Sequence, residues 1–284
     1  MGLKVLLIYG LLVILWGAWV RVSHSGDGCG QSWPLCAEEL IPQTNAGKTW
    51  VEFLHRVTSG LYGIAVVAGL IFSWRAQGHG VSVTARQRVR FWASVTTVLM
   101  IVEALLGARL VLAGFVAQNQ SFGRLLTMSL HQLNSLALMG STFCWYWRVR
   151  HPETSRGLRK DEWFLIFGFF ALAILGSWSA LSSTLFPSQS LLQAFAQDFA
   201  NDSPWPIRLR IFHPFFAVAW LTMMVHHWQR LEFKRLTLLW LGAGFFGLVM
   251  LLSLSPSWMK IGHLLLTHLL WLSLLWSFQK APST

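Results

Sequence analysis

Four histidines occupy equivalent positions in four apolar segments of this 284-residue sequence. His55, His131, His213 and His263 each fall a few residues inside the outer end of a predicted membrane helix, on the second, fourth, sixth and eighth such segment. Imidazole nitrogen is an axial ligand of haem iron, and ligands on facing helices of a bundle can hold a porphyrin between them. Four imidazoles at one depth therefore predict two bis-histidine haem sites, although any single one of them would be explained by an interhelical hydrogen bond.

The composition is typical of a membrane protein. Hydrophobic residues make up 54% of the chain and charged residues only 12%, and the 17 tryptophans are of the type favoured at bilayer interfaces. We therefore expect an all-α membrane protein with eight transmembrane helices, each near the length that crosses about 30 Å of hydrocarbon. The predicted segments are 5–20, 50–74, 91–115, 122–147, 162–182, 208–229, 236–254 and 258–278.

The positive charges predict the orientation. Most Lys and Arg residues fall in connections that face inward if the N-terminus is inside, so we expect both termini in the cytoplasm. The net charge of +11 is then a topology signal, and it does not indicate a nucleic-acid surface. We expect the first segment to be a retained helix in a prokaryotic plasma (inner) membrane, because neither a cleavage pattern nor a transit-like leader is present.

A weak internal repeat relates two halves of the chain. A Gly-Ala-Trp motif begins at Gly17 and a Gly-Ser-Trp motif begins at Gly176, and the histidine of the next predicted helix follows 38 and 37 residues later. Two copies of four helices would share one orientation, as parallel repeats do. We therefore expect an N-terminal four-helix half, 1–150, and a C-terminal four-helix half, 151–284.

The repeat also selects among the remaining histidines. It matches His131 with His263, whereas His268 lies five residues deeper and about 140° around the helix. We expect His263 to be the ligand and keep His268 as the alternative. The other histidines are expected to have structural or solvated roles, and they are His24, His79, His151, His226 and His227.

Two carboxyl groups fall within predicted helices. Glu52 precedes His55 by three residues and shares its face, where it could move protons, pair with Arg56, or do both. Glu103 is expected to pair with Arg109 or with a cation of another helix. Arginines near the outer helix ends could bind the propionates of a haem, and they are Arg56, Arg109, Arg124, Arg208 and Arg210.

The cysteines suggest an oxidising outer compartment. Cys29 and Cys36 lie in the predicted outer loop 21–49, where we expect a disulfide, with two free thiols as the alternative. Cys144 is expected to be a packing residue. The second predicted outer loop, 183–207, has no cysteine. Pro214 directly follows His213 and is expected to disturb the sixth helix locally.

These residues together resemble the haem A synthase family over nearly the whole chain. The resemblance is carried by the loop from Cys29 to Cys36 with its Trp-Pro-Leu stretch, the Glu-x-x-His-Arg motif at Glu52, a Leu-Gly pair at Leu106, and the histidines of helices four, six and eight. It implies an enzyme, namely a membrane oxidoreductase of haem biosynthesis. Such an enzyme oxidises the C8 methyl group of haem O to a formyl group and so makes haem A for terminal oxidases.

The resemblance also implies residue roles and partners. Glu52 matches the catalytic carboxylate of the family, and Cys29 and Cys36 match its outer-loop cysteine pair. The implied partners are haem O, the enzyme that makes haem O, an unidentified electron acceptor and the lipid bilayer, with no nucleic acid; an oligomer is compatible with the sequence. The substrate haem O is implied at His55, His131 and Arg56, and a haem b cofactor at His213, His263, Arg208 and Arg210.

Two other functions fit part of this pattern. A bis-histidine membrane b-type cytochrome would use the same four histidines to pass electrons without modifying its haem, but it has no evident need for Glu52 or for the cysteine loop. A transporter built from repeats would explain eight helices and the buried carboxyls. It would not explain four histidines at one depth.

Overall fold

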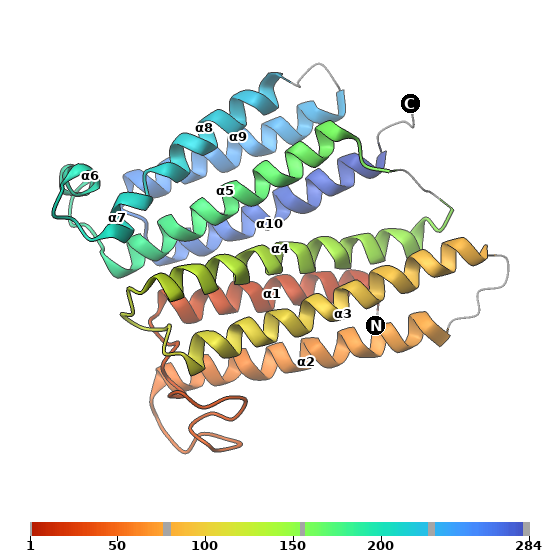
Figure 1. Ribbon diagram of the computed structural model, residues 1–284, viewed down its shortest axis with the longest axis horizontal. Coiled ribbons are helices and arrows are strands. Elements are labelled where there is room, and N and C mark those ends of the chain that lie inside the picture. The colour runs from red at the N-terminus through yellow and green to blue at the C-terminus, as the bar shows by residue number, and fades with distance from the viewer. Residues whose placement is uncertain (1, 76–80, 154–156, 227–230, 281–284) are drawn as a thin grey trace. The chain divides into compact units, whose positions relative to one another are not determined.

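The chain folds into helices. The structure is a computed structural model that describes residues 2–75, 81–153, 157–226 and 231–280. Within these ranges the regular structure is helical apart from an isolated bridge between Cys36 and Glu39. The helices are α1 (Leu3–Val22), α2 (Gly47–Arg75), α3 (Val83–Leu112), α4 (Phe122–Arg150), α5 (Lys160–Leu185), α6 (Leu191–Phe199), α7 (Trp205–Leu209), α8 (Phe212–His226), α9 (Leu231–Leu252) and α10 (Ser257–Lys280) (Figure 1).

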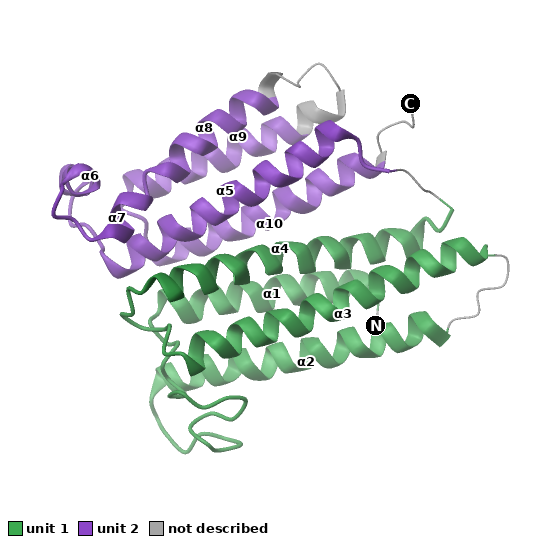
Figure 2. Ribbon diagram, in the orientation of Figure 1, with its two compact units in different colours: residues 1–156 green, residues 157–284 purple. Residues whose placement is uncertain are grey.

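The chain divides into two compact units, Met1–Arg156 and Gly157–Thr284 (Figure 2). In the first unit α1 packs on α2, α2 on α3 and α3 on α4, and α4 returns to α1. In the second unit α5, α8, α9 and α10 follow the same order of neighbours, and α10 returns to α5. Each unit thus contains four long helices in a closed ring, whereas a repeat that relates the two units stays a prediction.

Five described helices are long and apolar enough to cross a membrane, namely α1, α2, α3, α5 and α10. The apolar part of α9, Leu236–Leu252, is shorter. α4 does not reach the same hydropathy, because polar side chains such as Ser129, Asn134 and Thr142 lie on it and are buried within its unit. The chain is therefore an all-helical membrane protein, although composition alone identifies fewer spans than the eight expected.

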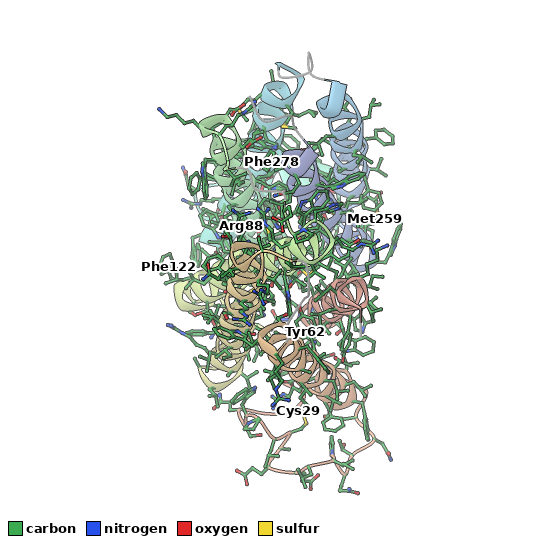
Figure 3. The ribbon with its side chains drawn as sticks, turned by 90° about the vertical axis from the view of Figure 1, so that its right-hand side faces the viewer. Cys29, Tyr62, Arg88, Phe122, Met259 and Phe278 are labelled. Carbon is green, nitrogen blue, oxygen red and sulfur yellow. A yellow bond between two sulfur atoms is a disulfide. The ribbon has the colours of Figure 1, made fainter. Side chains whose placement is uncertain are left out.

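The core of the first unit is aromatic and aliphatic. Leu6, Tyr62, Val66 and Trp145 belong to one buried cluster in which side chains of α1, α2 and α4 meet. The ring of Trp145 lies so close to Gly69 that a Cβ atom there would come within 2.5 Å of it. Close approach at a small residue is a common way for membrane helices to pack. Figure 3 shows Tyr62 among the helices of this unit and Cys29 in the loop beside them.

The core of the second unit is built from stacked aromatic rings. Phe169 on α5 stacks on Trp271 of α10 with ring centroids 5.2 Å apart, and it meets Trp240 of α9 edge to face at 5.4 Å. Gly168 lies beside Trp220 of α8 in the way that Gly69 lies beside Trp145. These contacts hold α5 against the other long helices of the unit.

The second outer loop and the sixth predicted segment differ from expectation. In place of a plain loop, the stretch 183–207 contains the short helix α6 and the start of a second one, α7, which ends at Leu209. The predicted helix 208–229 begins only at Phe212, which puts Pro214 in the first turn of α8. A proline in the first turn removes no helical hydrogen bond, whereas further along it would displace the carbonyl one turn earlier. Pro214 therefore lies where a helix tolerates proline, two residues after the start of α8, and a disturbance inside the sixth helix stays a prediction.

Candidate haem and carboxylate site

Two of the four predicted ligands face each other in the second unit. The ring centroids of His213 on α8 and His263 on α10 lie 6.1 Å apart, with the ring planes at 84°. Two imidazoles that bind one metal from opposite sides have centroids about 6 Å apart, since each metal–nitrogen bond is about 2 Å long. The ring of Phe246 lies parallel to that of His263 at 6.3 Å and provides an apolar neighbour.

The other two predicted ligands lie together in the first unit. His55 on α2 and His131 on α4 are close enough to interact electrostatically with each other and with Glu103 on α3. Nδ1 of His131 lies 3.3 Å from Oε1 of Glu103. The same carboxylate accepts hydrogen bonds from Asn134 Nδ2 at 2.6 Å and from the Ser135 hydroxyl. Glu103 is thus paired with a candidate ligand on α4, where the sequence suggested Arg109 or another cation.

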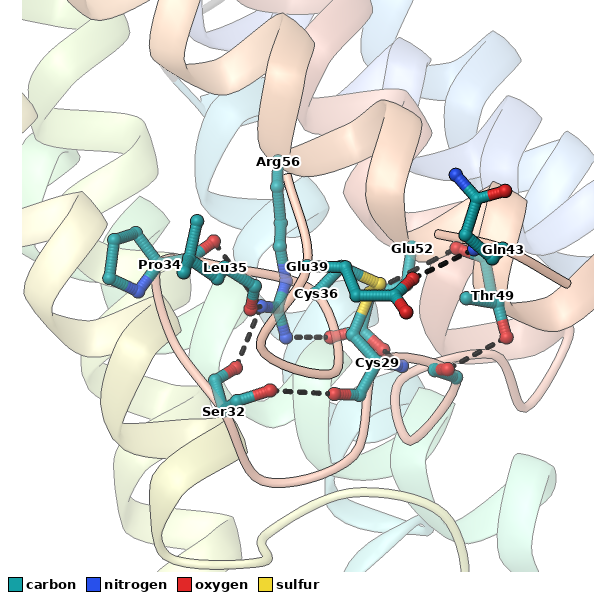
Figure 4. Close-up of a disulfide and its surroundings, with 11 residues drawn as sticks. Cys29, Ser32, Pro34, Leu35, Cys36, Glu39, Gln43, Thr49, Glu52 and Arg56 are labelled. Carbon is teal, nitrogen blue, oxygen red and sulfur yellow. Dashed lines mark hydrogen bonds and ion pairs between the residues drawn. A yellow bond between two sulfur atoms is a disulfide. The ribbon is translucent and has the colours of Figure 1, made fainter. Parts of the chain in front are cut away.

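Glu52 is buried at the junction of α2 and the first outer loop. Glu52 is only 3% exposed to solvent. The Glu52 carboxylate accepts a hydrogen bond from the backbone N–H of Cys29 at 2.8 Å and one from Arg56 at 2.6 Å (Figure 4). The ion pair between Glu52 and Arg56 that the sequence suggested is therefore present, and it leaves the carboxylate attached to both the helix and the loop.

The first outer loop is closed by the predicted disulfide. Cys29 and Cys36 are bonded, with 2.01 Å between the sulfur atoms, and both residues are almost fully buried (Figure 4). The guanidinium of Arg56 donates to the carbonyls of Ser32 at 2.7 Å and Leu35 at 2.6 Å, which lie between the two cysteines. Cys144 is a free, half-buried cysteine on α4, and its role as a packing residue stays a prediction. One side chain, Arg56, thus links the disulfide loop to Glu52.

The two arginines expected beside the second haem interact with the outer loop. Arg208 on α7 donates to the carbonyl of Asn201. Arg210 forms an ion pair with Asp198 and donates to the carbonyl of Ala194 at 2.7 Å. Burial raises the pKa of Asp198, and the charge of Arg210 opposes that rise. These contacts use donors that a propionate would otherwise occupy.

The outer end of the first unit has two arginines whose Nε atoms are buried. Arg124, at the start of α4, donates to the carbonyls of Ala117 at 2.7 Å and Asn119 at 2.8 Å, and its Nε is buried with no hydrogen-bond partner. The Nε of Arg21 on α1 is also buried with no partner, and Arg21 lies within electrostatic range of Arg124 and His131. Arg21 was not predicted from the sequence as a site residue. Its position as a cation in the last turn of the first helix was the signal that could have indicated it.

The alternative ligand and the other described histidines do not belong to these two pairs. His268 is fully buried, and its Nδ1 lies 3.0 Å from the carbonyl oxygen of Leu264 one turn earlier on α10. The ring of His151, at the end of α4, lies 4.3 Å from that of Trp147. His24 has a positive φ in the first outer loop. His79 and His227 lie outside the described residues, as does the side chain of His226.

The residues of both pairs fit a haem. Nδ1 of His55, His213 and His263 is buried and has no hydrogen-bond partner, so this atom of each ring is available to a ligand. Among the described residues no group of three or more His, Cys, Asp or Glu side chains could hold a metal ion. A protein metal site usually needs about four donors. A pair of imidazoles therefore suits a metal that brings most of its ligands with it, as haem iron does.

Comparison with known proteins identifies the family. The model of the COX15-CtaA family, described as cytochrome oxidase assembly protein, matches residues 3–275. The chain belongs to this family, the family of the haem A synthases. It is similar to a protein named Heme A synthase from Alkalihalophilus pseudofirmus, with 31% identity over 173 residues, 59% of this chain and 54% of the relative. With the Heme A synthase of Shouchella clausii the identity is 39% over 104 residues, 37% of this chain and 33% of the relative.

A longer relative of this haem A synthase family member carries another name. A protein named Protoheme IX farnesyltransferase from Thermus thermophilus is 34% identical over an alignment 284 residues long, and this alignment covers 94% of this chain. The match covers only 45% of the Thermus protein. The chain therefore spans about half the length of the curated relatives it matches, or less.

Proposed function

We propose that this chain is a haem A synthase that oxidises the C8 methyl group of haem O to a formyl group. The observation that carries the proposal is the buried Glu52 carboxylate, three residues before the candidate ligand His55 and hydrogen-bonded to the disulfide loop. An ionisable group buried in a membrane protein is costly and usually functional. A protein that only relays electrons would have no use for it.

The two histidine pairs bind different haems in this proposal. His55 and His131 bind the substrate haem O in the N-terminal half, 1–150, and His213 and His263 bind a haem b in the C-terminal half, 151–284. When bound, haem b supplies a one-electron carrier that takes electrons from the substrate. The distance of 6.1 Å between the ring centroids of His213 and His263 supports their assignment to one iron.

With water as the source of the oxygen, oxidation of the methyl group to a formyl group releases protons and electrons, and Glu52 accepts the protons that the methyl group loses. A general base must lie within hydrogen-bond reach of the proton it removes, and its position matters before its acidity does. The Cys29 N–H and the Arg56 guanidinium fix both carboxylate oxygens, so Glu52 has one orientation relative to α2. Arg56 therefore positions the base. In its place Arg21 and Arg124, whose Nε atoms are buried without a hydrogen-bond partner, bind the propionates of haem O.

The setting of the enzyme follows from its family and composition. We propose a multi-pass protein of the bacterial plasma membrane, with both termini in the cytoplasm and eight transmembrane helices as two parallel repeats. The similarity to a Thermus protein named for farnesylation of protohaem supports a working relation with the enzyme that makes haem O. That enzyme would supply the substrate, and an electron acceptor outside this chain would remove the electrons.

The histidine pairs alone also suit a bis-histidine cytochrome, so the test must detect the product. Membranes of cells that make haem O but no haem A are prepared with and without this chain, and their non-covalent haems are extracted and separated. The proposal predicts a new pigment with the mass of haem A only when the chain is present. Bound haem without any formyl-haem would support the cytochrome and overturn the synthase.

A further inference from the structure

Each of the four candidate ligands lies against a glycine of a neighbouring long helix. His55 on α2 faces Gly17 on α1, and His213 on α8 faces Gly176 on α5. On α10, His263 faces Gly247 of α9, and on α4, His131 faces Gly107 of α3. The sequence repeat drew attention to Gly17 and Gly176, but it gave no reason to connect Gly107 or Gly247 with a histidine.

Three of these contacts are too close for an added Cβ atom unless the histidine ring moves. A Cβ atom at Gly17 would lie 2.9 Å from Cε1 of His55, and Cβ atoms at Gly176 and Gly247 would lie 3.0 Å from Cε1 of their histidines. Carbon atoms in favourable contact are about 3.5 to 4.0 Å apart. At Gly107 the corresponding distance to His131 is 3.9 Å, so an added methyl group fits there.

Other glycines of the same helices do not show this relation. Gly60 on α2 and Gly244 on α9 have no atom within 4 Å of an added Cβ. Gly69 and Gly168 face tryptophan rings of the helix cores. The glycines that face histidines are therefore a distinct set within the membrane helices, with one member on a neighbour of every ligand-bearing helix.

The contact has different consequences for a free and a ligated imidazole. A free ring can turn about its side-chain torsions and avoid a new methyl group at small cost. A ring bound to iron is fixed at both ends, by its own backbone and by the metal–nitrogen bond. A methyl group at Gly17, Gly176 or Gly247 would therefore oppose haem binding while it leaves the haem-free fold intact.

We propose that Gly17, Gly176 and Gly247 are positioning residues that hold the imidazoles of His55, His213 and His263 in the orientation that binds haem. The proposal rests on the proposed haem sites and deepens them, since it says what fixes the ligand rings. Gly107 has the same place beside His131 but a looser contact. It is therefore the one member of the set that tolerates alanine.

The test measures haem affinity in purified full-length protein. Haem-free wild type and the variants Gly17→Ala, Gly176→Ala and Gly247→Ala are titrated with ferric protohaem, and the bis-imidazole absorbance bands are followed. The three variants should bind haem at the altered site at least about tenfold more weakly, because a shift of about 1 Å in a ligating group is costly. Gly60→Ala, Gly244→Ala and Gly107→Ala serve as matched controls and should stay within about twofold of wild type.

The thermal midpoint of the haem-free protein separates positioning from folding. Alanine is the better helix former, so none of these variants should lower that midpoint. If haem affinity and redox midpoint potential are unchanged in Gly176→Ala and Gly247→Ala, the proposal is wrong. It is also wrong if these two variants lose no more haem affinity than Gly244→Ala does. If wild type itself binds no protohaem, the proposed haem sites fail, which is a separate result.

Discussion

The backbone N–H of Cys29 donates a hydrogen bond to Oε2 of Glu52, with 2.8 Å between the two atoms. Because Cys29 also forms the disulfide with Cys36, the closure of the outer loop and the position of the buried carboxylate are connected. Arg56 makes the second connection, since one guanidinium reaches both Glu52 and two carbonyls of the loop. The loop and the carboxylate should therefore respond together to mutation.

Removal of the disulfide should loosen Glu52. The double variant Cys29→Ser, Cys36→Ser lacks the disulfide, which stabilises the folded protein by about 2 to 3 kcal/mol because it restricts the unfolded chain. We expect haem A formation to fall about tenfold, while haem bound by His213 and His263 stays at the wild-type level. Extracted haems and the absorbance of the purified protein measure the two effects. Cys144→Ser is the control, and equal losses in both variants would contradict the connection.

Glu52→Gln keeps the shape of the side chain but removes the base. General bases contribute about 100-fold or more to rates, so haem A formation should fall by at least about 100-fold while haem stays bound. Glu38→Gln removes one negative charge from an exposed position in the same loop and should have no effect. The product is quantified from extracted pigments. Undiminished haem A in Glu52→Gln would remove this residue from the mechanism.

Arg56→Lys distinguishes a loop contact from a propionate contact. Lysine keeps the charge but cannot span Glu52, Ser32 and Leu35, so we expect the loop to loosen and haem A formation to fall about tenfold. The affinity for protohaem and for its dimethyl ester should change by the same factor. A loss confined to the free acid would show instead that Arg56 binds a propionate.

Glu103→Gln removes the charge that faces His131. Carboxylates that orient a ligating histidine typically contribute about 10-fold to 100-fold in metal affinity. We therefore expect haem binding in the first unit to weaken about tenfold and its redox midpoint potential to rise, because a negative charge near the iron is lost. The second unit supplies an internal reference. An unchanged redox midpoint potential would show that the charge of Glu103 does not act on the ligand His131.

The two histidines of α10 should behave differently. His263→Ala should deplete one haem, since the His263 ring faces His213 at 6.1 Å. His268 is fully buried, so His268→Ala should lower the free energy of unfolding by about 2 to 3 kcal/mol and leave the haem content intact. Haem content and thermal unfolding check the pair, and the reverse pattern would assign the ligand to His268.

Hydropathy and motif spacing predicted much of this architecture. The positions of α1 and α2, though not their exact ends, the disulfide and the Glu52–Arg56 pair follow from local patterns, because each depends on residues close in the sequence. The break before α8 was visible only as Pro214, and its exact place depends on how the helix restarts. The helices α6 and α7 were missed, since short amphipathic segments in a polar loop give a weak periodic signal.

The contacts between helices were not accessible from one sequence. The pairing of Glu103 with His131 depends on which faces of α3 and α4 meet, and neither residue carries a pattern that indicates the other. The same holds for Gly247 and His263. The role of Arg56 as a link to the loop carbonyls was also hidden, because a guanidinium near a haem ligand is equally suited to a propionate.

The most direct test of paired histidine ligation is low-temperature electron paramagnetic resonance of the purified chain loaded with ferric protohaem. We expect two low-spin bis-histidine signals. His55→Ala or His131→Ala should convert only one of them to high spin or remove it, and His213→Ala or His263→Ala should do so only to the other. A spectrum in which all four variants alter the same single signal, or in which none alters any, would contradict two separate pairs.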